Sequence, residues 1–145
     1  MYVDAFTLVS DSQAVTADAV STHTIDLSNV TPKRDVSVGE EIGFAVAIEV
    51  AADFTTTDET YVIQAIQSAN ANLTSPDVIG QVTLSAAQRA AGSLVFVPLS
   101  DVTKRYLGLN FDVGGTTPTV TVSAWLTSRK LFSKTHTYYA RAYAV

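Results

Sequence analysis

The sequence contains no cysteine, one methionine and one tryptophan, and only 16% of its 145 residues are charged. The absence of cysteine excludes disulfides, thiolate metal sites and a cysteine nucleophile. No uncharged apolar run approaches the length of a membrane-spanning helix, and Asp4 lies where the apolar core of a signal peptide would be. We therefore expect a soluble, intracellular product with no membrane partner.

Acidic residues are missing from the last part of the chain. Residues 1–112 hold all fourteen acidic residues and five basic ones, a net charge of −9, whereas residues 113–145 hold four basic residues and no acid, a net charge of +4. A chain divided in this way can bind a copy of itself, or a mosaic surface, through its end. The overall charge of −5 argues against nucleic acid as a partner, because neutralising phosphates requires a broad basic surface.

The C-terminal segment combines basic and aromatic residues. Residues 130–145 hold half of the six tyrosines, and tyrosine beside arginine is favoured at the centres of protein interfaces. We expect one domain over residues 1–128, followed by a basic aromatic arm over residues 129–145. The interface residues predicted in this arm are Arg129, Lys130, Phe132, Tyr138, Tyr139, Arg141 and Tyr143.

Apolar residues recur at period two far more often than at helical spacing, which predicts an all-β domain. The clearest strand covers residues 42–50, in which every second side chain is large and apolar. Turn residues separate about eight such segments, and the only helical candidate is a short turn at residues 85–91, so the pattern indicates an antiparallel β-sandwich. The expected strands cover residues 3–10, 23–27, 42–50, 60–68, 78–84, 94–99, 107–113 and 120–126.

Neither histidine has the surroundings expected of a catalytic base. His23 lies on the apolar parity of a short predicted strand, which favours a structural role, and His136 lies in the arm, which would hold catalytic geometry poorly. No nucleophile elbow, HExxH helix or phosphate-binding loop motif occurs. The sequence therefore predicts no enzyme activity, no catalytic residue and no cofactor.

Acidic side chains gathered in one segment can hold calcium, and Asp53, Asp58 and Glu59 form such a group. Their spacing matches no known calcium loop, so we interpret them as solvated residues at strand ends and expect no metal site. In a later mixed-charge turn, interpreted as a solvated hairpin, Lys104 and Arg105 could face an acidic partner.

The only tryptophan, Trp125, is expected to point away from the core. It has the opposite parity to the apolar residues of its predicted strand, which are Val120, Val122, Ala124 and Leu126. Two interpretations remain open. Trp125 could pack beneath the arm or at a sheet rim, or it could anchor an interface with another subunit, where tryptophan is often a hot spot.

Five phrases carry a resemblance to a known family: Asp11-Ser12-Gln13-Ala14-Val15-Thr16, Ala19-Val20-Ser21-Thr22, Ile25-Asp26-Leu27, Val38-Gly39-Glu40 and Arg105-Tyr106-Leu107-Gly108-Leu109-Asn110-Phe111. Together they resemble the jelly-roll capsid cement, or decoration, proteins of short-tailed bacteriophages. The resemblance runs from residue 1 to about residue 128 and leaves out the arm.

This resemblance implies an eight-stranded jelly roll, made in the host cytoplasm, that lies on the outer surface of the capsid in the virion. It implies a symmetric homo-oligomer, a dimer or a trimer, that clamps neighbouring subunits of the phage major capsid protein, with no enzyme activity. Because the arm departs from the family pattern, its role is not inherited. We expect the arm and Trp125 to contact a sister subunit or the shell.

Two questions stay open at the level of sequence. Period-two patterning is common to jelly rolls and other Greek-key sandwiches, so it does not give the strand order. A carbohydrate- or receptor-binding β-module of a phage fibre or spike would also expose an aromatic residue such as Trp125, which could stack on sugars.

Overall fold

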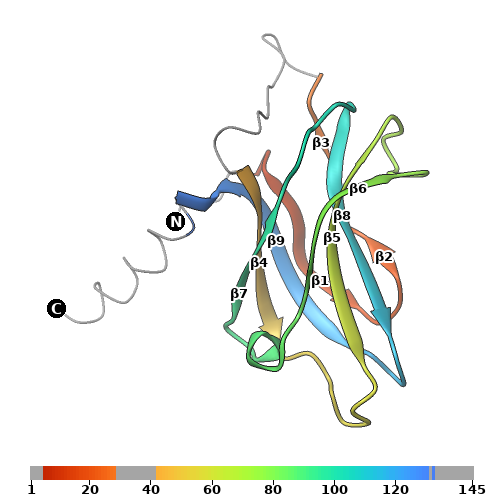
Figure 1. Ribbon diagram of the computed structural model, residues 1–145, viewed down its shortest axis with the longest axis vertical. Helices are drawn as coiled ribbons and strands as arrows, with labels where there is room; N and C mark the ends of the chain where they lie inside the picture. Colours follow the sequence, from red (N-terminus) through yellow and green to blue (C-terminus); the bar gives the residue numbers. More distant parts are fainter. Residues whose placement is uncertain (1–4, 29–41, 131, 133–145) are drawn as a thin grey trace, which may run out of the picture.

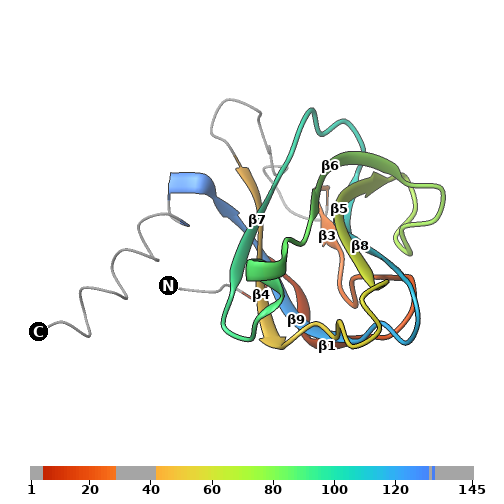
Figure 2. The same cartoon turned by 60° about the horizontal axis from the view of Figure 1, so that its bottom comes forward.

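Two antiparallel β-sheets face each other in a computed structural model of the chain, which describes residues 5–28, 42–130 and 132 (Figure 1). The first sheet has the strand order β1-β9-β4-β7, and the second has the order β2-β8-β5-β6, with β3 also pairing with β8. In the turned view of Figure 2 the two sheets form two layers. The strands are β1 Leu8–Val15, β2 Ala19–Val20, β3 Ile25–Asp26, β4 Ile42–Val50, β5 Thr60–Ser68, β6 Asp77–Thr83, β7 Leu94–Pro98, β8 Tyr106–Gly114 and β9 Val120–Ser128.

The chain follows the path of a jelly roll. If β2 and β3 are counted as two short pieces of one strand beside β8, the chain crosses from one sheet to the other at every connection except that from β5 to β6. Eight strands in two sheets with these Greek-key connections define the jelly roll. The predicted antiparallel sandwich is therefore confirmed, and the strand order is now known as well.

Alternating side chains from both sheets form the core between them. On β4, Phe44, Val46 and Ile48 are at most 1% exposed, and on β8 the same alternation buries Leu107 and Leu109. A slip of one residue in either strand would turn these side chains to solvent. The apolar alternation thus determines which face of each strand points inward, and residues 42–50 form the predicted strand with the predicted ends.

The N-terminal strand differs from its prediction. A strand was expected over residues 3–10, whereas β1 begins at Leu8 and continues to Val15. Its register with β9 shifts at two places, and Ser12 has a φ of 46°. A bulge of this kind breaks the period-two pattern, so the second half of the strand does not stand out in the sequence.

Two short elements also differ from the sequence prediction. The strand expected over residues 23–27 is reduced to the two residues of β3, and the two residues of β2 carry too little pattern to be predicted. The helical candidate is a 3-10 turn over Ala86–Arg89, where the Gln88 side chain accepts a hydrogen bond from the Ser85 N–H at 3.0 Å.

The β5–β6 loop, residues 69–76, folds back over the outer face of the second sheet. Ile66 and Leu73 are 0% and 2% exposed, yet neither belongs to the core between the sheets. A Cβ placed on Gly108 of β8 would lie 2.5 Å from Leu73 Cδ1 and 2.9 Å from Ser21 Oγ. Glycine at this outward position therefore leaves the space that the leucine of the loop fills.

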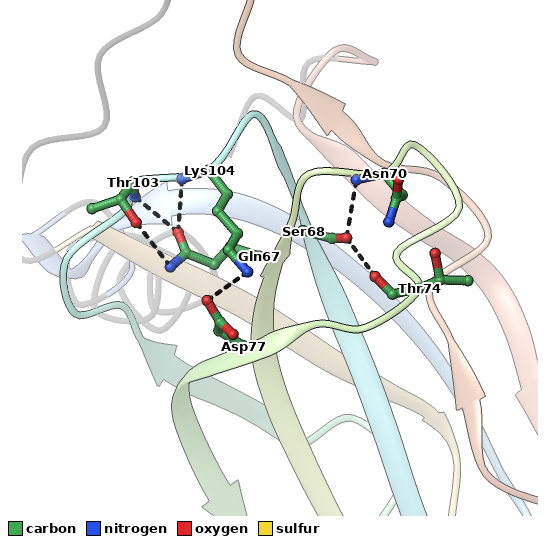
Figure 3. A network of polar contacts seen from close by, with 7 residues as sticks. All are labelled: Gln67, Ser68, Asn70, Thr74, Asp77, Thr103 and Lys104. Atoms are coloured by element: carbon green, nitrogen blue, oxygen red, sulfur yellow. Dashed lines mark hydrogen bonds and ion pairs between the residues drawn. The ribbon is translucent and has the colours of Figure 1, made fainter.

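Buried polar side chains fasten the loops at one end of the sandwich (Figure 3). Gln67 Oε1 accepts hydrogen bonds from the backbone N–H groups of Thr103 and Lys104 at 2.8 and 3.1 Å. Ser68 Oγ donates to the Thr74 carbonyl at 2.6 Å. Because buried polar groups are costly unless they are paired, we interpret this network as structural.

Candidate interaction surface

Four apolar residues, three of them large, form one row across the outer face of the first sheet. Backbone pairing places Ala45 of β4 opposite both Phe96 of β7 and Trp125 of β9, and it places Trp125 opposite Leu8 of β1. At least one chain neighbour of each residue lies in the core, so alternation points the four side chains away from it. We name these four residues the apolar row. The outward position predicted for the half-buried Trp125 is thus confirmed.

Small residues of β4 lie at the centre of this face. Gly43, Ala45 and Ala47 alternate with core residues, so β4 presents no large side chain to the outside except near its end. A Cβ on Gly43 would lie 2.6 Å from Phe96 Cζ, so the phenylalanine ring covers this glycine. Ala45 is 0% exposed although it lies outside the core between the sheets. The larger flanking side chains therefore lean over β4.

The first residues of the predicted arm lie at one end of this face. Arg129, Lys130 and Phe132 have helical backbone conformations, and the turn projects from the end of β9, away from the second sheet (Figure 2). The Phe132 and Phe96 rings have centroids 5.4 Å apart and are tilted by 51°, and Arg129 Cζ lies 5.3 Å from the Phe96 centroid. These distances are those of a tilted aromatic pair and of a cation–π contact. Because Arg129 and Lys130 are exposed, this end of the face is basic.

An exposed carboxylate lies at the opposite end of the same face. Glu49, near the end of β4, accepts a hydrogen bond from Ser12 Oγ at 2.7 Å and another from Ser123 Oγ. These hydrogen bonds, with that of Ser123 the stronger, hold the pKa of Glu49 below its ordinary value. The outer face of the first sheet thus has a basic end, an apolar centre and a fixed anionic end.

The residues predicted as interface residues are only partly brought together. Trp125 lies in the apolar row, Arg129 and Phe132 contact Phe96, and Lys130 is exposed beside them. The other four, Tyr138, Tyr139, Arg141 and Tyr143, lie outside the described residues.

Sequence reasoning missed several residues of this face, and Phe96 and Glu49 are the most important of them. Phe96 alternates with Val95 and Val97, a signal that was present in the sequence but that carries meaning only once the pairing of β7 with β4 is known. Glu49 gave no signal, because its serine partners come from two other strands.

Lys104 and Arg105, the two bases that were expected in a solvated hairpin, pair with aspartates of the chain itself. Lys104 Nζ lies 2.8 Å from an Asp77 carboxylate oxygen (Figure 3). Arg105 donates two parallel hydrogen bonds to Asp26, from Nε at 2.8 Å and from Nη2 at 2.9 Å. The predicted position of His23 on the apolar side of a strand is wrong, because this residue lies outside β3 and is exposed.

The acidic loop group is likewise less solvated than expected. Hydrogen bonds from Thr56 and Thr116 hold the pKa of the exposed Asp58 below its usual range. Glu59 is 1% exposed and accepts a hydrogen bond from Thr56 Oγ1, so it is a buried residue rather than a solvated one. Within residues 5–28, 42–130 and 132, no three or more histidine, cysteine or acidic side chains gather in a way that could hold a metal ion.

Two of the phrases that carry the family resemblance lie side by side. Ile25 pairs with Leu107 and Asp26 with Tyr106 across β3 and β8, and the Asp26–Arg105 pair closes this ladder. The bidentate geometry is the strong form of an arginine–carboxylate contact. These residues therefore hold β3 against the second sheet.

In a third phrase, residues 11–16, the side chain of Gln13 has a structural role. Gln13 Oε1 accepts hydrogen bonds from Ser10 Oγ at 2.7 Å and from the Thr22 N–H at 3.1 Å, and its Nε2 donates to the Val20 carbonyl at 2.9 Å. This glutamine joins β1 of the first sheet to the segment around β2 of the second. Its role is structural.

The outer face of the second sheet has a different character. Asn110 Nδ2 donates to Gln64 Oε1 at 2.8 Å, and Gln64 Nε2 donates to Gln81 Oε1 at 3.5 Å, so amides from β8, β5 and β6 form a ladder across the sheet. Asp112 is exposed two residues further along β8. The part of this face that carries the ladder is therefore polar.

Fold and surface together define a jelly-roll β-sandwich with one aromatic, bipolar outer face. The family model described as Bbp16 matches residues 9–126, which is most of the jelly roll, and the chain belongs to the Bbp16 family. No curated protein matches the chain. No helix of the described ranges is long and apolar enough to cross a membrane.

Proposed function

We propose that the protein is a structural capsid decoration protein. It binds the outside of a mature phage head as a homo-oligomer and clamps neighbouring major capsid protein subunits. The proposal rests on the resemblance of its sequence phrases to the cement proteins of short-tailed phages.

One structural observation carries the proposal: the aromatic side chains, the exposed bases and Glu49 lie on the same outer face. Aromatic residues and arginine are enriched where proteins bind one another, and such a face needs a large complementary surface rather than a small substrate. Clamping requires no chemistry. A protein that binds the assembled shell but not free subunits stabilises the assembly by mass action.

Binding to heads tests the proposal directly. Purified protein would be mixed with mature heads of its own virus, from which it had been removed, and with unassembled major capsid protein, and each mixture would be sedimented. We expect saturable binding to heads, little binding to free subunits, and heads that resist heat better once decorated. An absence of binding to heads would contradict the proposal.

The alternative is a carbohydrate- or receptor-binding module of a fibre or spike. The observation in its favour is Trp125, whose outward, half-buried ring could stack on a sugar. A glycan array would show specific binding that Trp125→Ala abolishes. Silence on the array, together with binding to heads, would reject this alternative.

A further inference from the structure

We propose that two copies of the chain pack through the outer faces of their first sheets, around a two-fold axis that runs across the strands at the level of the apolar row. This inference rests on the proposed function in one respect, because it names the partner of the same face. It commits to a second copy of this chain as the occupant of that face.

The positions of the charges along β4 and β9 are the first argument. Glu49 lies four residues from Ala45 toward one end of the face, and Arg129, just past the end of β9, lies four residues from Trp125 toward the other end, because the two strands are antiparallel and Ala45 pairs with Trp125. At about 3.3 Å per strand residue, the acidic and basic ends are therefore each roughly 10–13 Å from the row. The face is close to antisymmetric in charge about its apolar row.

Symmetry gives the second argument. Two identical faces that look at each other are related by a two-fold axis lying in the plane between them. An axis across the strands places the basic end of each copy over the acidic end of the other, whereas an axis along the strands places like charges together. Charge complementarity therefore selects the axis across the strands.

The shape of the face fits this arrangement. Sheets that pack face to face lie about 10 Å apart with their strands rotated by about 30°, and their side chains interdigitate. Phe96 covers the buried Gly43, and Ala45 between Phe96 and Trp125 is buried as well, so the larger side chains form the outer surface of the row. Along the axis, each apolar row meets the partner's apolar row, so the half-buried Phe96 and Trp125 of one copy can pack against those of the other.

Charge reversal on each end of the face tests the arrangement. Sedimentation equilibrium would be measured for full-length wild type, Glu49→Arg and Arg129→Glu. Each single variant places like charges together at two symmetric positions, so we expect its dimer Kd to rise on the order of tenfold relative to wild type at low salt. The expected rise becomes smaller at high salt, because exposed charges are screened.

Recombination makes the test specific to this geometry. In an equimolar mixture of Glu49→Arg and Arg129→Glu, a heterodimer again pairs opposite charges at both positions, and so does the homodimer of the double variant. We expect near wild-type association in both cases. A structural defect in either single variant would not be repaired by mixing.

Asp112→Arg is the matched control, since it reverses an exposed strand carboxylate on the outer face of the other sheet and should leave the dimer Kd unchanged. Wild-type protein that is monomeric, single variants that associate like wild type, or a mixture that fails to recover would each overturn the inference. Binding of wild type to heads is scored separately. Failure there contradicts the capsid function, whereas recovery in the mixture still supports the two-fold face.

Discussion

The two sheets bury similar alternating apolar rows toward each other, but their outer faces differ. The second sheet is covered at one end by residues 69–76, with Leu73 packed over Gly108, and elsewhere it carries the amide ladder. The first sheet has no such cover from the described loops, and it presents Phe96 and Trp125 between a basic and an acidic end. The chain itself covers part of the outer face of the second sheet, whereas the outer face of the first sheet is suited to a partner. The inward residues of one strand can therefore stabilise the fold while its outward residues form a binding surface.

The largest effect on folding stability is expected on the covered face. Leu73→Ala would leave a void over Gly108, so we expect the free energy of unfolding to fall by about 2–4 kcal/mol. The dimer Kd at temperatures where the variant is folded should not change. Urea denaturation checks the first statement and sedimentation the second. Leu8→Ala in the apolar row is the matched change on the open face, and its stability loss should be smaller.

The largest effect on association is expected on the open face. Trp125→Ala removes the largest side chain at the centre of the proposed interface, which should weaken the dimer by about 2 kcal/mol, or roughly thirtyfold in Kd. The variant should still show the far-ultraviolet circular dichroism of the folded sandwich. Unchanged association in this variant would place the interface elsewhere.

Replacing the buried amide of Gln67 should cost more folding stability than replacing the outer amide of Gln64. Gln67→Ala would leave the backbone N–H groups of Thr103 and Lys104 without their acceptor, so we expect a loss of about 2 kcal/mol in the free energy of unfolding. Gln64→Ala breaks amide contacts on the outer face and should cost less than about 1 kcal/mol, because water can replace them. If the two variants lose the same free energy of unfolding, the Gln67 network in Figure 3 stabilises the fold no more than the amide ladder of Gln64 does.

The smallest effect concerns the anionic end of the open face. Hydrogen bonds from Ser123 and then Ser12 lower the pKa of Glu49 in the folded chain. The stabilising contribution is therefore fully present above the pKa that Glu49 has in the unfolded chain and is lost as the pH falls through the lower, folded value. Ser123→Ala should move the pKa of Glu49 upward. Carbon-detected NMR titration of the carboxyl group in the wild type and in the variant measures the shift.

Much of the fold could be predicted, because alternation is a local property. In residues 42–50, five large apolar side chains at alternate positions predict a strand. The same alternation predicted that Trp125 points outward. The bulge at Ser12 removed this signal from the second half of β1, and two-residue strands such as β2 carry almost none. Strand order needed the pairing of segments that are distant in sequence.

The candidate surface could be predicted only in part, because it also depends on the pairing of strands that are distant in sequence. Trp125, Arg129, Lys130 and Phe132 were indicated by residue type. The apolar row, in contrast, becomes visible only after β7, β4, β9 and β1 are aligned. The charge pattern of the sequence did not reveal the ion pairs that Lys104 and Arg105 form. Their partners are aspartates on β6 and β3 that no local rule assigns to them.

Trp125 itself offers the most direct test of the central claim, because it is the only tryptophan of the chain. Its fluorescence emission and the sedimentation coefficient would be followed together through a dilution series of full-length protein. We predict that dissociation and a red shift of the emission share one midpoint, as the ring moves from the interface into water. A dimer that dissociates with no change in the emission, or protein that is monomeric at every concentration, would contradict the account.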